Sequence, residues 1–553
     1  MAAKTVNLDA LIPREDFLAD EGGPSVGESE KRSATTTDLT LGESFCSTLR
    51  KPDFQRETAA WTPNHIVSLV QAYIESDLIP AVVCWQSPAR LSFVIDGAHR
   101  LSAIMAWILD DYGDRETSIK FYNNRIQAEQ RSIAERTRRL VNKEIGSFAD
   151  IKAEQRNAGS NPKLSSYAAA LPHSGIQLQW LKKSEAEKAE QAFFTINQSA
   201  VKIDATELKI LDTRFKPNAI IARAIVRNAT GHKYWGSFSA GSILKIEESA
   251  RNINELLFTP PLSPPIKTLE LPIAGHGYGS QSLPLIYELA NLANGLPVED
   301  PSKHKTKRLT KKRNSNEAII TQVAPDEKET LRLLNNTLQL ARKMTGMHPS
   351  SLGLHPAVYF YSASGRHQPT AVLAMSAIVH DMKNKNSLHA FCDVRSDFEE
   401  FLLEHKDFIN QITRKTGSMA KGLKLLKEYL EFVIGGLQEG LGRTEVKNNL
   451  ANSDKFSFIQ IPSLVFSTQV KNFSTPAKQH AFLEEALEAA ITCKICDSRK
   501  DGKSMTADHM TDKRLGGAAS PDNLQYVHPF CNSSYKEHKQ QQTTKQKSAT
   551  DPY

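Results

Sequence analysis

The chain has 553 residues, of which 40% are apolar and 24% are charged, a composition that excludes fibrous, collagen-like and wholly disordered proteins. Lys and Arg outnumber Asp and Glu by 69 to 62, and the net charge of +7 is compatible with a nucleic-acid partner without requiring one. There is no run of about 18 apolar residues and no apolar signal-peptide core, so we expect a cytoplasmic protein without a membrane partner.

The first segment of the chain differs in composition from the remainder. Residues 1–45 are rich in Gly, Ser, Thr and acidic residues and contain few aromatic residues, so we expect a flexible leader. Order is expected from Phe45 onward, in a domain over residues 46–215. Within that domain the segment 125–165 is polar and weakly periodic, which indicates a mobile stretch.

The clearest secondary-structure pattern of this domain surrounds a tight turn. Apolar residues at helical spacing predict a helix over 61–79. The short apolar runs 81–85 and 91–95 predict two strands joined by a Ser-Pro turn, and a helix is expected over 101–109. The order strand, turn, helix places the residues of the turn at a helix N-terminus.

The rest of the chain is predicted to be mainly helical up to residue 475, with the strongest helical spacing over 330–341 and 398–437. A basic segment, 303–313, has seven Lys or Arg among eleven residues. It is interpreted either as a solvated loop or as a contact for DNA phosphates. We therefore expect a helical middle domain over 216–475 and a final domain with a basic tail over 476–553.

The final domain contains a metal-ligand pattern. Cys493 and Cys496 form one pair at two-residue spacing, and His528 and Cys531 form a second pair after 31 intervening residues. Two such pairs provide the four ligands of a tetrahedral zinc site, whereas a single pair would be weak support for a metal. A purely structural zinc knuckle fits this spacing as well as a catalytic domain does.

The residues around the two pairs add a second pattern. They are Asp508, His509, Gly516, Gly517, Asn523, Asn532 and Lys536. Together with the paired ligands they resemble the HNH, or ββα-metal, nuclease motif over about 45 residues, with His528 in place of a third cysteine. A neutral histidine beside a phosphate can take a proton from water near pH 7, and a divalent ion stabilises the negative charge that develops during phosphodiester cleavage.

The HNH resemblance implies a role for each of these residues. His509 would be the general base, and Asp508 and Asn532 would hold Mg²⁺ or another divalent ion. Asn523 would orient His509 through a hydrogen bond to the backbone of its loop, and His538 is the substitute for Asn532. The zinc would stabilise a fold too small to have a sufficient core of its own.

The predicted turn near residue 97 carries a third pattern, formed by Asp96, Gly97, His99 and Arg100. A Gly-containing turn before a helix presents free N–H groups and a positive dipole end, and an arginine adds a planar fork for phosphate. The carboxylate of Asp96 is suited to binding a metal ion or orienting a water molecule. A capped strand–helix junction without a ligand is the alternative interpretation.

Upstream and downstream motifs extend this pattern. The segment 52–61, which reads PDFQRETAAW, and the segment 193–208, which begins FFTINQ, stand in the order found in GmrSD-type restriction enzymes and related phosphorothioate-sensing defence nucleases. The resemblance covers about residues 50–210 and implies a ParB/sulfiredoxin-like fold linked to NTP hydrolysis. The residues that would line the nucleotide pocket are Gln55, Arg56, Asp96, Gly97, His99 and Arg100. The sequence departs from the family pattern at Ala98 and His99, where the family has two glutamines.

The two resemblances together predict a multidomain α+β protein. It would have an N-terminal ParB/sulfiredoxin-like domain, a mainly helical middle domain and a C-terminal HNH (ββα-metal) domain stabilised by zinc. Its expected function is metal-dependent cleavage of phage or other foreign DNA, as a restriction or antiviral defence enzyme. The N-terminal domain would gate this activity by sensing a nucleotide or a DNA modification. A DNA-binding regulator with a structural zinc ribbon and a mobile-element or homing-type nuclease are the alternatives.

Overall fold

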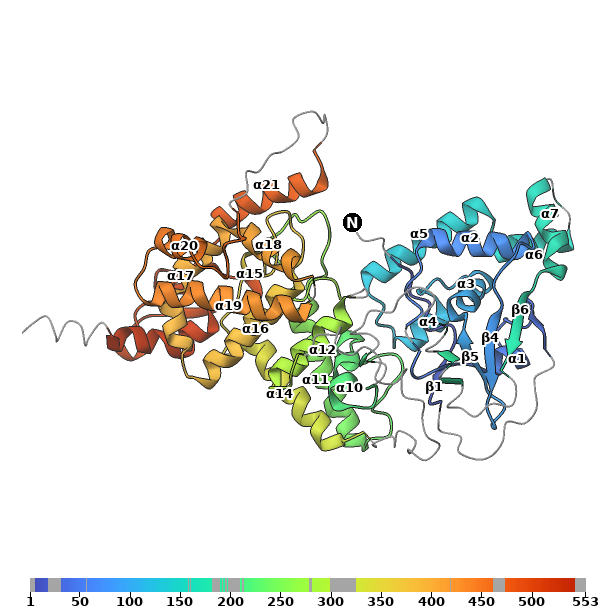
Figure 1. Ribbon diagram of the computed structural model, residues 1–553, viewed down its shortest axis with the longest axis horizontal. Helices are drawn as coiled ribbons and strands as arrows, with labels where there is room; N and C mark the ends of the chain where they lie inside the picture. The colour runs from blue at the N-terminus through green and yellow to red at the C-terminus, as the bar shows by residue number, and fades with distance from the viewer. Residues whose placement is uncertain are drawn as a thin grey trace, which may run out of the picture. The chain divides into compact units, whose positions relative to one another are not determined.

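The computed structural model shows a mixed α/β protein. The residues it describes are 5–17, 31–55, 57–157, 159, 161–181, 189–190, 192–193, 196, 209–210, 213–277, 281–298, 325–417, 419–460 and 473–542. They fall into two compact units (Figure 1). The first consists mainly of Met1–Arg214, and the second consists mainly of Trp235–Gly277 and Gln281–Tyr553.

The first unit is built on a mixed six-stranded sheet with the order β1-β3-β5-β4-β6-β2. Its strands are β1 (Arg14–Glu15), β2 (Ser33–Ala34), β3 (Leu49–Pro52), β4 (Val82–Gln86), β5 (Ser92–Asp96) and β6 (Ile176–Trp180). β3 runs parallel to β1 and β5, and β4 runs parallel to β6. The pairs β4–β5 and β2–β6 are antiparallel. Because β3 and β5 are parallel neighbours, their carboxyl ends lie at the same edge of the sheet.

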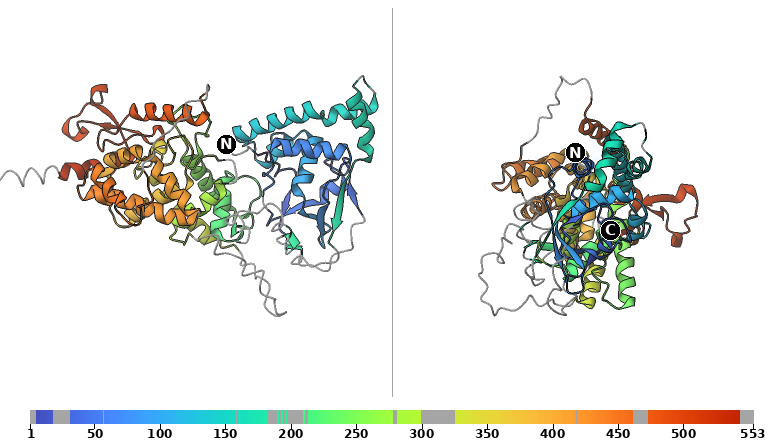
Figure 2. Two further views of the ribbon diagram at one scale, coloured as in Figure 1. Left: turned by 45° about the horizontal axis from the view of Figure 1, so that its top comes forward. Right: turned by 90° about the vertical axis from the view of Figure 1, so that its right-hand side faces the viewer.

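The helices of the first unit pack mainly against one face of this sheet, as the views of Figures 1 and 2 show. They are α1 (Ser44–Thr48), α2 (Pro63–Ile74), α3 (Ala98–Leu109), α4 (Glu116–Phe121), α5 (Ala128–Glu144), α6 (Phe148–Arg156), α7 (Pro162–Ala170) and the 3-10 turn η1 (Leu171–His173). Because side chains alternate along a strand, Val94 joins the core beneath α2 and α3, whereas its neighbours Phe93 and Ile95 join a second cluster on the opposite face. The sheet is therefore buried on both sides.

The hairpin and the helices beside it agree with the sequence predictions. The predicted helix over 61–79 is observed as α2, which begins after the N-cap residue Thr62 with a proline in its first turn. The two predicted strands are β4 and β5, and the helix expected over 101–109 is α3, which begins three residues earlier at Ala98.

The flexible leader expected over residues 1–45 is contradicted by the described part of that segment. Val6 and Leu8 are almost fully buried, and their amides donate to the carbonyls of Trp61 (2.7 Å) and Thr58 (2.8 Å). Asp9 accepts from the buried Lys51 ammonium at 2.6 Å, and burial lowers the pKa of Lys51 to about 8. Composition could not show this, because the segment is ordered by contacts with residues 42 to 55 positions later in the chain.

The mobility expected over 125–165 is also wrong for the described residues there, which form α5, α6 and α7. The charged residues of α5 cover its outer face, while Ile133, Ala134 and Val141 make a narrow buried stripe. Such a stripe supplies few apolar residues per turn, so the periodicity of the sequence is weak even though the helix is packed. The predicted motif at 193–208 lies almost entirely outside the described residues.

The second unit is mainly helical, in agreement with the sequence prediction. Its helices are α10 (Pro217–Val226), α11 (Ala240–Phe258), α12 (Ser282–Ala293), α14 (Glu327–Met344), α15 (Pro356–Tyr359), α16 (Pro369–Asn384), α17 (Leu388–Glu404), α18 (Lys406–Thr416), α19 (Met419–Gln438), α20 (Arg443–Ala451) and α21 (Thr475–Glu488). α14 contains the predicted helix over 330–341. The stretch 398–437 is divided between α17, α18 and α19, with a break at Gly417 in the left-handed region. The basic segment 303–313 lies outside the described residues.

The last part of the second unit contains two strands and short turns. They are the 3-10 turns η3 (Gly502–Ser504), η4 (Lys513–Leu515) and η5 (Pro521–Asn523), the strands β7 (Thr506–His509) and β8 (Leu524–Val527), and the π-helical turn η6 (Cys531–Tyr535). This C-terminal segment packs on the helices of the same unit. Phe530 donates to the carbonyl of Ser351 (2.9 Å), and the hydroxyl of Tyr535 donates to Asp393 (2.7 Å) on α17.

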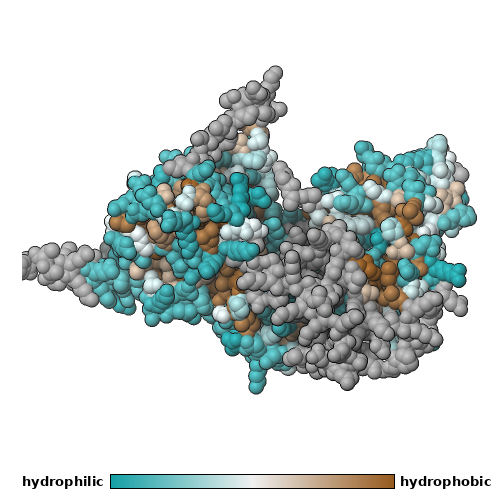
Figure 3. All heavy atoms as spheres, viewed as in Figure 1, coloured by the Kyte–Doolittle hydropathy of each residue, from teal (hydrophilic) through white to brown (hydrophobic). Residues whose placement is uncertain are grey.

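No helix among the described residues is both long enough and apolar enough to cross a membrane. The visible faces of the two units mix hydrophilic and hydrophobic side chains, with hydrophilic ones more abundant over the helical unit (Figure 3).

Candidate active site

The structure brings the four predicted metal ligands together. The ligand atoms of Cys493, Cys496, His528 and Cys531 all lie within 4.8 Å of one another, and all four residues are buried. Three sulfur atoms and one imidazole nitrogen in such a group suit zinc or another borderline metal better than Mg²⁺ or Ca²⁺, which prefer oxygen ligands. The donor set therefore fits a metal of the zinc type.

A tight turn aims the first two ligands at the same point. The amide of Asp497 donates to the carbonyl of Cys493 at 2.8 Å, and the amide of Cys493 donates to the carbonyl of Ser498 at 2.8 Å. Asp497 has a φ of 59°, in the left-handed region that short polar side chains tolerate. The backbone thus reverses immediately after Cys496 and leaves both thiols on the inner side of the turn.

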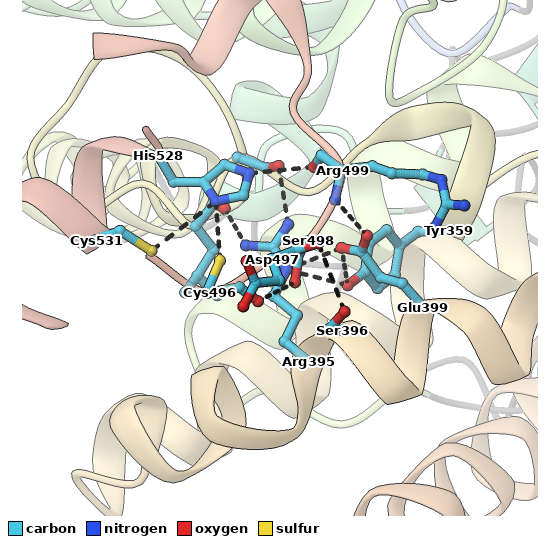
Figure 4. A network of polar contacts seen from close by, with 12 residues as sticks. Tyr359, Arg395, Ser396, Glu399, Cys496, Asp497, Ser498, Arg499, His528 and Cys531 are labelled. Atoms are coloured by element: carbon cyan, nitrogen blue, oxygen red, sulfur yellow. Dashed lines mark hydrogen bonds and ion pairs between the residues drawn. The ribbon is translucent and has the colours of Figure 1, made fainter. Parts of the chain in front are cut away.

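His528 is held in the form that can bind a metal. Its Nε2 atom lies 3.1 Å from the carbonyl oxygen of Arg499, which can only accept, so Nε2 carries the proton (Figure 4). Its Nδ1 atom faces the sulfur atoms of Cys496 (3.4 Å) and Cys531 (3.9 Å). Burial lowers the pKa of His528, which keeps the ring neutral and the Nδ1 lone pair directed into the group of thiols.

The thiols influence one another strongly. Hydrogen bonding to Cys493 and then to Cys531 raises the pKa of Cys496, and burial adds to the effect. The hydrogen bond from Cys496 lowers the pKa of Cys493 in turn. Metal binding requires deprotonated thiols, so a bound divalent cation would stabilise the thiolate form of all three cysteines.

The ribbon formed by β7 and β8 carries the Asp-His pair. Asp508 stands opposite Gln525 and His509 stands opposite Leu524 in the antiparallel register. Residues that are adjacent in a strand point to opposite faces, so Asp508 and His509 lie on different sides of the ribbon. Asp508 is buried and His509 is half-buried, on the same side as the exposed Leu524.

Asp508 faces the helical residues that follow Cys531. Its two carboxylate oxygens accept from the Lys536 ammonium at 3.0 and 2.9 Å, and one of them also accepts from Gln525 at 2.8 Å. The same ammonium donates to the carbonyl of His509 at 2.7 Å. Lys536 therefore neutralises the carboxylate and fixes the end of β7. The cross-strand partner Gln525 was not predicted, although the ribbon register would have indicated it.

Asn523 holds the loop that follows His509. Its side-chain oxygen accepts from the amide of Thr511 at 2.7 Å, and its side-chain nitrogen donates to the carbonyls of Thr511 (3.1 Å) and Ala518 (2.8 Å). A side chain at Gly517 would place its Cβ atom 1.9 Å from the Thr511 carbonyl oxygen, so only glycine fits there. The Gly pair and Asn523 together determine the path of the chain out of β7.

Asn532 and His538 occupy different positions. The Asn532 side chain lies beside β7, where its nitrogen is 3.4 Å from the carbonyl oxygen of Ala507. The ring of His538 instead stacks on His389 of α17, with ring centroids 4.5 Å apart. Asn532 and its substitute His538 are therefore not equivalent: Asn532 lies beside the strand that carries Asp508, whereas His538 does not.

The N-terminal turn brings together most of the residues predicted for a nucleotide. Asp96 ends β5, Gly97 is the N-cap residue of α3 with a φ of 100°, and Arg100 stands in the first turn of that helix. The guanidinium of Arg100 donates to Asp96 at 2.6 Å and to the carbonyl of Ala81 at 3.2 Å. A Cβ atom at Gly97 would lie 2.8 Å from Val82, so the turn requires glycine.

The remaining predicted residues are His99, in the first turn of α3, and Gln55 and Arg56, which follow the neighbouring strand β3. The amide of Ala60 donates to Nε2 of His99 at 3.3 Å, and the ring of His99 lies against Trp61 with centroids 5.6 Å apart. Gln55 follows β3, whose carboxyl end lies at the same edge of the sheet as that of β5, and it is buried. Arg56 lies outside the described residues.

The Cys/His group, the ribbon with its Asp-His pair and the helical residues that follow have the arrangement expected of the HNH motif. Residues 493–538 match the family model described as HNH endonuclease. Residues 40–210 match the family model described as GmrSD restriction endonuclease, N-terminal domain. The chain thus combines the two domains of a GmrSD-type fusion. No curated protein and no solved structure gives a significant match to the chain.

Proposed function

We propose that the chain is a metal-dependent DNA endonuclease that defends a cell against phage or other foreign DNA from the cytoplasm. The observation that carries this proposal is the placement of Asp508 and His509 on a ribbon beside a buried Cys/His group. A DNA-binding zinc ribbon without catalysis would need neither residue. The match to an HNH endonuclease family supports phosphodiester hydrolysis as the reaction.

The residues on the ribbon and beside it would have different roles in the reaction. His509, half-buried at the end of β7, would accept the proton of the attacking water. Asn523 would keep His509 in place by holding Thr511, two residues further on. Lys536 would hold Asp508 and the His509 carbonyl and add positive charge beside the phosphate.

Two metals would serve this domain. Cys493, Cys496, His528 and Cys531 would hold a zinc ion that stabilises the fold. Asp508 and Asn532 have the oxygen atoms that Mg²⁺ prefers, and such an ion, when bound, would stabilise the negative charge on the leaving oxygen. Both oxygens of Asp508 accept from the Lys536 ammonium, so an ion bound there would have to share or displace these contacts.

The N-terminal domain would regulate this cleavage. We propose a ParB/sulfiredoxin-like fold for it, which the Gly-containing turn between β5 and α3 supports. The backbone N–H groups at the start of α3 and the Arg100 guanidinium would bind the phosphates of an NTP or a modified DNA backbone. Asp96, at 2.6 Å from that guanidinium, would serve a metal or a water molecule during hydrolysis.

Cleavage assays with the full chain test the nuclease proposal. Plasmid DNA, with and without base or phosphorothioate modification, would be incubated with Mg²⁺ or a chelator and with each NTP. His509→Ala should lower the cleavage rate by about 10²–10⁴-fold, the usual effect of losing a general base. His538→Ala is the matched control, because His538 stacks on His389 instead of lying on the ribbon. Equal cleavage by wild type and His509→Ala would contradict the proposed role.

A further inference from the structure

The Cys/His group lies against helix α17 of the helical region (Figure 4). Two residues of that helix, Arg395 and Glu399, are fully buried and form an ion pair at 2.9 Å. A buried pair of this kind costs desolvation free energy that its own attraction does not always repay. The other contacts of Arg395 and Glu399 therefore indicate what the pair contributes to the structure.

Glu399 is connected to His528 through one intervening residue. Its Oε2 atom accepts from the backbone amide of Arg499 at 2.8 Å. The carbonyl of the same residue, Arg499, accepts from Nε2 of His528 at 3.1 Å. Glu399 thus holds the backbone that sets both the tautomer and the orientation of the imidazole.

Arg395 holds a second backbone segment near His528. Its guanidinium donates to the carbonyls of Leu352 (2.5 Å) and Gly353 (3.1 Å). Gly353 lies so close to the imidazole that a Cβ atom there would be 2.8 Å from Cδ2 of His528. The ion pair on α17 therefore fixes two backbone segments that lie against the ring of His528.

We propose that Arg395 and Glu399 are positioning residues of the metal centre, so that retention of the metal by the HNH segment depends on helix α17. This inference rests on the proposed metal site at Cys493, Cys496, His528 and Cys531. Groups that hydrogen-bond to a metal-ligating histidine orient its lone pair and raise its basicity, and their loss typically lowers metal affinity about 10- to 100-fold. Here that group is the carbonyl of Arg499, and Glu399, 100 residues earlier in the chain, holds the backbone of Arg499 in place.

Two neighbouring contacts provide matched controls. Glu400, the next residue of α17, also binds Arg499, but through the guanidinium (2.6 Å) and not through the backbone. Tyr359 donates to Oε1 of Glu399 at 2.9 Å and does not contact Arg499 through that bond. Glu400→Gln removes a charge near Arg499, and Tyr359→Phe perturbs the buried pair, while both leave the link from Glu399 to His528 in place.

The experiment measures zinc in the purified full-length protein and then the rate of its release to a chelating indicator. Glu399→Gln should release zinc about 10- to 100-fold faster than wild type, whereas Glu400→Gln and Tyr359→Phe should stay within about twofold. After replacement by Co²⁺, the thiolate-to-metal absorption of Glu399→Gln should shift, which a purely structural role would not cause. Release at the wild-type rate by folded Glu399→Gln would overturn the inference.

A second variant covers the case in which Glu399→Gln fails to fold because Arg395 is left unpaired. Arg395→Met combined with Glu399→Leu removes both buried charges and keeps apolar packing. It should fold and still release zinc at least tenfold faster; wild-type retention would overturn the inference. Absence of zinc from the wild type would overturn both the metal site and this inference. Zinc retention without DNA cleavage would contradict only the nuclease proposal.

Discussion

The HNH segment and the N-terminal turn both place an acidic residue at the end of a strand and pair it with a basic residue of a following helical segment. Asp508 pairs with Lys536, and Asp96 pairs with Arg100. Arg100 follows Asp96 by four residues, so one helical turn brings them together. Lys536 follows Asp508 by 28 residues, so the pair depends on the folding of the whole segment.

The two sites differ in the surroundings of the pair. In the HNH segment the neighbouring buried Cys/His group could hold a metal, and the geometry of the Asp-His pair would then depend on that metal. In the N-terminal turn the acid and the base stand at the end of a sheet that is packed on both faces. The comparison teaches that similar ion pairs can depend on a metal in one region and on an apolar core in the other.

Removing a proposed metal ligand should produce the largest effect. It tests whether the HNH segment depends on a metal. Cys496→Ser should eliminate bound zinc and leave the HNH segment protease-sensitive, because structural zinc sites supply roughly 10–16 kcal/mol of apparent binding free energy. Metal analysis and limited proteolysis would measure both effects. Cys46→Ser, at a buried cysteine of the first unit, should leave the zinc content unchanged. Full zinc occupancy in Cys496→Ser would refute the ligand assignment.

Loosening the loop after β7 should have a smaller effect, confined to the chemistry. Asn523→Ala removes three hydrogen bonds to the loop, and the resulting displacement of His509 should lower cleavage by about 10²-fold. Zinc content should stay the same. Asp522→Ala changes the exposed neighbour and should cleave normally. A cleavage rate for Asn523→Ala within twofold of wild type would show that the loop does not position His509.

The smallest effect is expected at the N-terminal turn. It tests whether the Asp96–Arg100 pair binds a ligand or only supports the fold. Arg100→Ala should weaken NTP binding by about tenfold or more, because a charge-assisted hydrogen bond contributes about 1.5–3 kcal/mol. Calorimetry with ATP, GTP and CTP would measure it. Arg90→Ala, in the exposed β4–β5 turn, is the control. Asp96→Ala should affect hydrolysis more than binding. If no nucleotide binds wild type and both variants cleave DNA normally, the turn is a structural junction.

The sequence predicted the parts of the structure that depend on short-range patterns. The hairpin β4–β5 and helix α3 follow one another with tight turns, so their periodicity is visible locally. The grouping of Cys493, Cys496, His528 and Cys531 was predicted because each pair lies in a single turn of backbone. The same holds for Asn523, whose place in the motif indicated a contact with the loop after His509.

Features that depend on distant partners could not be predicted in this way. Residues 5–17 are ordered by contacts with later parts of the chain. β1 pairs with β3, Val6 and Leu8 join the core that α2 and α3 also line, and Phe17 joins the cluster on the opposite face of the sheet. Arg395 and Glu399 have the i, i+4 spacing that is common for ion pairs on the surface of a helix. Nothing in the sequence indicates that both are buried beside the metal ligands, because that burial results from packing across about 100 residues.

The edge strand β2 has a consequence for the synthesis of the protein. Ser33 pairs with Gln177 of β6, about 140 residues later in the chain. At a typical synthesis rate of about 5–20 residues per second, β2 would wait roughly 7 to 30 seconds for its partner strand. During that interval the side chains of Ala34 and Leu39, which are fully buried in the finished sheet, would be exposed. Faster elongation or a chaperone that covers this segment should therefore increase the yield of correctly folded protein.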